Sequence, residues 1–94
     1  MTRKQRRLIL IAAAGMSEKD RNEMVRGMVA RLAERLKQNG DDIEGWQRLV
    51  RAYMVLGERD KARAAAFEAK RAFASDHDKL RRIDDMIKEV GLQG

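Results

Sequence analysis

The chain has 94 residues, a net charge of +6, no cysteine and no proline, and 38% of its residues are charged. The length suits one domain, and the lack of cysteine excludes disulfides, cysteine-ligated zinc and a thiol nucleophile. Because Ala, Leu, Arg, Lys and Glu favour helices and no segment alternates apolar with polar residues, we expect an all-α fold.

Residues 1–15 differ in character from the rest of the chain. A basic stretch, MTRKQRR, is followed by seven apolar residues, LILIAAA, and then Gly15. A spanning helix needs about 20 apolar residues, so this run is too short to cross a membrane. It is either a very short signal peptide, a vestigial membrane anchor or a disordered tail. We favour the tail, with residues 16–94 forming a single helical domain.

The first helix is predicted at residues 18–38. Ser17 with Asp20 fits a helix start, where a hydroxyl accepts a bond from a free backbone amide. Apolar residues then recur at helical spacing and predict one buried stripe: Met24, Met28, Leu32 and Leu36, with Val25, Val29 and Ala33 beside them. We expect the helix to stop at Asn39-Gly40 through a left-handed glycine.

The second helix follows a pair of aspartates and ends at Gly57. Asp41 or Asp42 caps it, and Asp41 with Glu44 fits a capping box. The expected buried face consists of Trp46, Leu49, Val50, Tyr53 and Leu56.

The third helix is predicted from Asp60 to about Ala74, with a buried face of small residues that lets helix axes approach closely. That face contains Ala62, Ala65, Ala66, Ala69 and Phe73. Phe67 lies off this stripe, and we expect it to pack inside the domain. A fourth helix follows, with Leu80, Ile83, Met86, Ile87 and Val90 on its apolar face and an end at Gly91.

The second and third helices together resemble a tetratricopeptide repeat, a hairpin of about 34 residues with the signature W-x2-L-G-x2-Y, then A-x3-F, then P. This chain has Trp46, Leu49 and Tyr53, followed by Ala62 and Ala69. The repeat departs from the signature where Val50, Ala66 and Ala74 replace a small residue, Phe and Pro. The resemblance predicts that Trp46 and Tyr53 are core residues and do not bind a ligand.

A longer stretch, residues 16–73, resembles the C-terminal periplasmic region of the CcmI (CycH) family of bacterial cytochrome c biogenesis proteins. The resemblance rests on the segments MVRGMV at 24–29, LAxRL at 32–36, DDxxGW at 41–46 and YxVLG at 53–57. It implies a periplasmic module that holds apocytochrome c through the C-terminal helix of the apoprotein. The membrane helices and most repeats of that family do not occur in this sequence, so we expect partial client binding.

The predicted peptide-binding groove lies on the side of the second helix that faces away from the core. Its residues are Glu44, Gln47, Arg51, Met54 and Val55. Methionine adapts to varied apolar partners, and arginine can pair with a carboxylate. The alternative is that the polar members are only the solvated side of an amphipathic helix.

Other functions are disfavoured by the sequence. Four tail residues carry much of the positive charge, and the other 17 basic residues are intermixed with 15 acidic ones, which argues against nucleic-acid binding. The chain lacks a phosphate-binding glycine loop and has one histidine, His77, so we expect no enzyme activity, cofactor or metal.

The rival hypothesis is a self-associating repeat module that forms a homodimer. Contact with a membrane, and export from the cytoplasm, depend on the role of residues 1–15.

Overall fold

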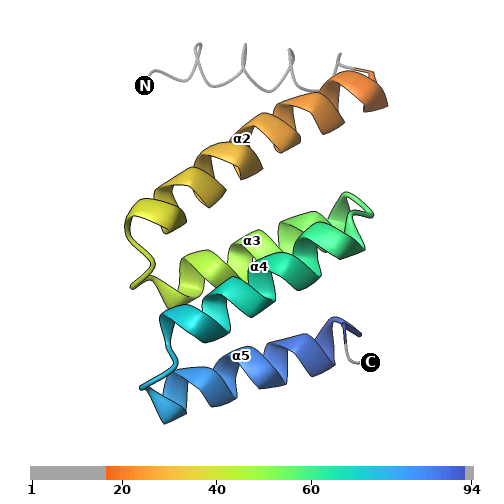
Figure 1. The fold of residues 1–94 in the computed structure, drawn as a ribbon. Helices are drawn as coiled ribbons and strands as arrows, with labels where there is room; N and C mark the ends of the chain where they lie inside the picture. The colour runs from red at the N-terminus through yellow and green to blue at the C-terminus, as the bar shows by residue number, and fades with distance from the viewer. Residues whose placement is uncertain (1–16, 93–94) are drawn as a thin grey trace, which may run out of the picture.

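The computed structural model describes residues 17–92, and within this range it contains four helices (Figure 1). The helices are α2 (Glu18–Gln38), α3 (Ile43–Val55), α4 (Arg59–Ala72) and α5 (His77–Glu89). The all-α fold is confirmed, and α2 has the bounds predicted from the sequence. The predicted tail, residues 1–15, lies outside the described residues.

Three of the four helices begin at a side-chain cap. Ser17, Asp42 and Asp76 each accept a hydrogen bond from the backbone amide three residues further along, at 3.1, 3.0 and 3.2 Å. Such caps satisfy amides that have no partner within the helix. The cap of α3 is therefore Asp42, and the capping box predicted for Asp41 and Glu44 is wrong, because one residue of shift moves Glu44 out of the required position.

α3 and α5 end in the same way. Gly57 and Gly91 have φ angles of 74° and 75°, a left-handed conformation that glycine adopts without steric cost. The amide after each glycine donates to the carbonyl five residues before it, at 2.8 and 3.0 Å. The two glycines are 34 residues apart, as are the caps Asp42 and Asp76. The framework of the chain thus repeats with the period expected for the hairpin.

Gly40 does not provide the left-handed stop that was predicted after α2. Among the described residues only Gly57 and Gly91 have positive φ. Gly40 instead lies close to Trp46, whose indole Nε1 donates to the Gly40 carbonyl at 2.9 Å. A Cβ at Gly40 would lie 3.3 Å from the Leu36 carbonyl oxygen and 3.8 Å from the Trp46 ring. The contact with the Leu36 carbonyl oxygen is tight, so a side chain at position 40 would require a small local shift, whereas the distance to the indole is an ordinary van der Waals contact.

The arrangement is a central hairpin with one helix on each side (Figure 1). α3 and α4 form the hairpin and share the most extensive packing in the molecule. α2 packs chiefly against α3, whereas α5 packs against both α3 and α4. α3 consequently packs against all three other helices.

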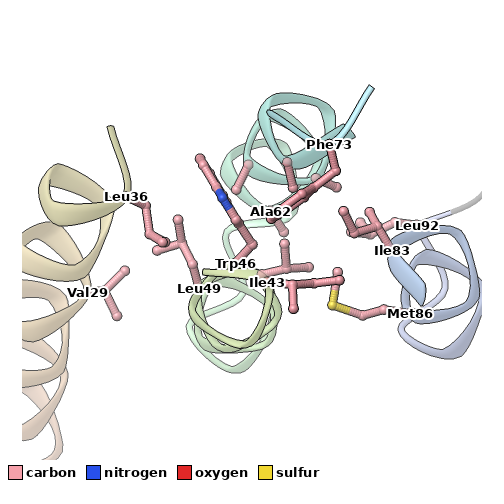
Figure 2. Packing of buried hydrophobic residues seen from close by; sticks show 14 residues of the cluster. Val29, Leu36, Ile43, Trp46, Leu49, Ala62, Phe73, Ile83, Met86 and Leu92 are labelled. Atoms are coloured by element: carbon pink, nitrogen blue, oxygen red, sulfur yellow. The ribbon is translucent and has the colours of Figure 1, made fainter. Parts of the chain in front are cut away.

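The core collects around Trp46, which is 3% exposed, and extends to both flanking helices (Figure 2). Four alanines of α4 are buried and allow α3 and α4 to approach closely: Ala62, Ala65, Ala66 and Ala69. Val29 and Leu36 of α2 enter the core from one side, and Ile83 and Met86 of α5 enter from the other (Figure 2). Trp46 is a core residue, as predicted, and Tyr53 is half-buried against the same cluster.

Two expectations about burial are wrong. Phe67 is 63% exposed, because α3 and α5 both pack on the alanine side of α4 and leave the side that carries Phe67 uncovered. Met24 and Met28 are 45% and 59% exposed. The buried stripe of α2 consists of Val29 and Leu36 with Val25 and Leu32 beside them, so the two methionines face outward.

Candidate functional site

The five residues predicted to bind a peptide lie together on the outward side of α3. They are Glu44, Gln47, Arg51, Met54 and Val55. Glu44, Arg51 and Val55 are exposed, while Gln47 and Met54 are half-buried at the edge of the face. Because α2, α4 and α5 hold α3 on its other sides, this face is presented on a firmly packed helix.

Arg51 connects the α3 face to α5. Its guanidinium lies 3.3 Å from the Glu89 carboxylate, and the two side chains are 56% and 68% exposed. Such an exposed pair contributes at most about 1 kcal/mol to stability. The pair shows that α3 and α5 border the same surface, and it leaves Arg51 able to exchange Glu89 for another carboxylate.

Met54 and Val55 differ in how freely they can meet a partner. Val55 is 84% exposed, so its substitution changes the surface with little effect on the core. Met54 is partly buried and packs against the core. A polar substitution at Met54 would therefore change stability as well as binding, and Val55 is the better position for testing the surface.

A second feature, absent from the sequence predictions, is an apolar groove between α2 and α3. It is a hollow of about 480 Å³ whose apolar lining comes from α2 and α3: Val25, Met28, Val29, Leu32 and Ala52. It lies on the α2 side of the outward face of α3, so the predicted site and the groove are neighbours on α3. We call it the α2–α3 groove.

Three arginines also line the α2–α3 groove, namely Arg31 and Arg35 of α2 and Arg48 of α3. Arg35 pairs with Asp42 at 3.1 Å. Within residues 17–92, neither Arg31 nor Arg48 forms an ion pair with a carboxylate. The hollow thus combines an apolar floor with positive charge.

The sequence contained one sign of this groove. Apolar residues on α2 occupy a wider arc than the contact with a single neighbouring helix requires, because Met24 and Met28 stand beside the stripe that α3 covers. Read as one stripe, the series predicted burial of all members. The excess width indicates a second contact surface on α2.

Within residues 17–92 no group of three or more His, Cys, Asp or Glu side chains is placed so that it could hold a metal ion. His77 is exposed in the first turn of α5. None of the four described helices is long and apolar enough to cross a membrane.

Two curated bacterial proteins match the chain over most of its length. Cytochrome c-type biogenesis protein CycH of Bradyrhizobium diazoefficiens is 56% identical over 85 residues, which cover 90% of this chain and 23% of the relative. The protein of the same name from Rhizobium meliloti is 41% identical over 83 residues, covering 88% of this chain and 22% of the relative. The chain belongs to the CycH family. The resemblance found in the sequence is therefore confirmed.

The chain spans less than a quarter of the length of these two CycH relatives. No family model matches it, and neither does any solved structure. In this CycH-family chain, the outward face of α3 and the α2–α3 groove are the two candidate binding surfaces.

Proposed function

We propose that the chain is a protein-binding module of cytochrome c maturation that holds an amphipathic helix of apocytochrome c. The CycH relatives are named for cytochrome c biogenesis, and the resemblance implies the C-terminal helix of the apoprotein as the client. One observation carries the proposal. The outward face of α3 stays uncovered while three helices pack around the rest of α3.

The chemistry of this face suits a helix with one apolar side. Val55 and the accessible part of Met54 offer apolar contact, as in other cases where a helix lies along a protein groove. Arg51 offers a charged hydrogen bond to a carboxylate at the rim, in exchange for Glu89. The role requires no cofactor, and family membership supports a periplasmic location.

Binding at this face should be weak. Specific interfaces generally bury at least about 1,000 Å², and the outward side of the 13-residue helix α3 supplies only part of such an area. In a longer relative, additional helices would extend the surface. For this chain we expect rapid exchange between free and bound states.

The test is a titration of the isotopically labelled full chain with a peptide of the C-terminal helix of apocytochrome c, followed by the amide resonances. The largest shifts are expected along α3 from Glu44 to Val55. Val55→Asp should weaken binding about tenfold or more, since it places a charge against an apolar partner, a change of about 1.4 kcal/mol. Phe67→Asp is the matched control, because Phe67 is 63% exposed on α4 and should leave binding unchanged.

Two results would contradict the proposal. One is full-strength binding by Val55→Asp, and the other is a set of shifts confined to α4. Sedimentation over a range of concentrations separates client binding from the rival role as a homodimer, since a client-binding monomer sediments independently of concentration.

A further inference from the structure

The 34-residue period gives residues 25–38 of α2 equivalents in α4, and all of α3 equivalents in α5. The caps Asp42 and Asp76 are equivalent, and so are Gly57 and Gly91 with their left-handed backbone. Between them, Leu49 corresponds to Ile83, and both are buried. The pair α2–α3 therefore has the same internal framework as the pair α4–α5.

This correspondence explains the α2–α3 groove. Four residues that line the groove correspond to the four buried alanines of α4: Met28 to Ala62, Arg31 to Ala65, Leu32 to Ala66 and Arg35 to Ala69. On α4 these positions form the surface on which α3 packs. The groove is consequently the place where a helix equivalent to α3 would lie against α2.

The side chains in the groove differ from their equivalents in size and charge. Alanines on α4 leave room for the large indole of Trp46, whereas Met28, Leu32 and two arginines fill part of that space on α2. A helix lying here needs smaller apolar residues than α3 has. It also needs carboxylates, because an arginine covered by a partner loses its water and is stabilised by an opposite charge.

We propose that the α2–α3 groove is a docking site for one amphipathic helix of a partner hairpin. The apolar stripe of this helix is flanked by carboxylates. The stripe lies on Val25, Met28 and Leu32, and the carboxylates pair with Arg31 and Arg48. This site is distinct from the client surface, since it uses the side of α3 that carries Arg48 and Ala52 rather than Arg51 and Val55.

Charge favours this occupant over two others. A second copy of α2 would bring arginines against arginines, because Arg21 and Arg35 share the outward side with Met24 and Met28, and like charges at an interface are costly. Residues 1–15 of the same chain carry four basic residues and no acidic one. A partner helix with acidic flanks matches the positive lining instead.

The test uses two synthetic helical peptides of about 18 residues, long enough to span the groove. Both have the same stripe of leucine and alanine, but one is flanked by glutamates and the other by lysines. Their dissociation constants for the full chain are measured by fluorescence anisotropy at low salt, where exposed charges act most strongly. We expect the glutamate peptide to bind at least about tenfold more tightly.

Substitutions in the chain test whether the preference for the glutamate peptide arises at the α2–α3 groove. Arg31→Glu should abolish or reverse the preference for the glutamate peptide, and Met28→Asp should weaken both peptides. Arg81→Glu makes the same change in net charge at an exposed position of α5 and should preserve the preference. Circular dichroism checks that each variant keeps its helices.

Several results would overturn the proposal. Equal affinity for the two peptides, no binding of either, or an unchanged preference in Arg31→Glu would each do so. Tighter binding by Ile11→Asp would assign the groove to residues 1–15, and a concentration-dependent dimer removed by Met28→Asp would assign it to a second copy. Val55→Asp should leave the glutamate peptide unaffected, so failure here is distinguishable from failure of client binding at α3.

Discussion

The two flanking helices, α2 and α5, differ in how they pack on the hairpin and in which side chains they expose. α5 packs against both helices of the hairpin and exposes no large apolar side chain, whereas α2 packs chiefly against α3 and exposes Met24 and Met28. α5 is also joined to its neighbours by polar contacts. Arg59 donates to the Gly91 carbonyl at 2.7 Å, and Lys70 pairs with Asp84 at 2.8 Å.

The two helices therefore differ in how well their outer faces suit contact with water. Stacked helical units need an outer element with a polar outer face, since an apolar outer face would aggregate. α5 meets that requirement and α2 does not. The shared 34-residue framework therefore does not determine whether the outer face of a flanking helix is polar or apolar. That depends on the side chains that face outward.

The largest effect is expected at Trp46, which joins the α2 end to the hairpin. Trp46→Ala removes a core side chain and the hydrogen bond to Gly40, so it should cost about 3–5 kcal/mol of unfolding free energy. This is a large share of the stability of a small domain. Thermal melting followed by circular dichroism measures the loss, and a melting temperature within a degree or two of the parent would contradict the assigned core.

The second prediction contrasts one residue type at the two ends. Met86 of α5 is 2% exposed and Met28 of α2 is 59% exposed. Met86→Ala should cost about 2–5 kcal/mol, whereas Met28→Ala should change the free energy of unfolding by less than about 0.5 kcal/mol. Urea titrations of both variants test the contrast. Similar losses would mean that the outward face of α2 is already covered in the isolated chain.

The smallest effect is a gain of stability in α2. Gly27 lies within this helix, and a Cβ added there would meet no atom within 4 Å. Gly27→Ala should raise the unfolding free energy by about 0.5–1 kcal/mol, because alanine loses less backbone entropy in a helix. Gly57→Ala is the control and should destabilise, since its φ is 74°. A destabilised Gly27→Ala variant would indicate an unrecognised neighbour.

Local signals in the sequence were sufficient for the helices and for most of the core. Ser17 and Gly57 mark helix ends by chemistry that acts within a few residues, and the spacing of Trp46, Leu49 and Tyr53 follows directly from the helical period. The outward face of α3 could be derived in the same way, since it is what remains once the core positions are assigned. Whether it binds a client stays a prediction.

The features that were missed depend on tertiary packing or on a choice between neighbours. Phe67 is exposed because of where α5 docks, and no local pattern on α4 contains that information. Asp41 and Asp42 are adjacent and chemically identical, so only the register of α3 decides which one caps it. The α2–α3 groove exists because no helix covers one side of α2 in the described structure. The wide apolar arc of α2 was a sign of it, but which of those residues α3 leaves exposed depends on how the two helices pack.

Trp46 has a spectroscopic consequence as well as a structural one. It is the single tryptophan of the chain, and its indole lies beneath the loop between α2 and α3 with its Nε1 bound to the Gly40 carbonyl. The emission of an indole shifts to longer wavelength when water reaches it. Intrinsic fluorescence therefore reports, without any added label, on water reaching the core at Trp46, whether the joint between α2 and the hairpin opens or the hairpin itself unfolds.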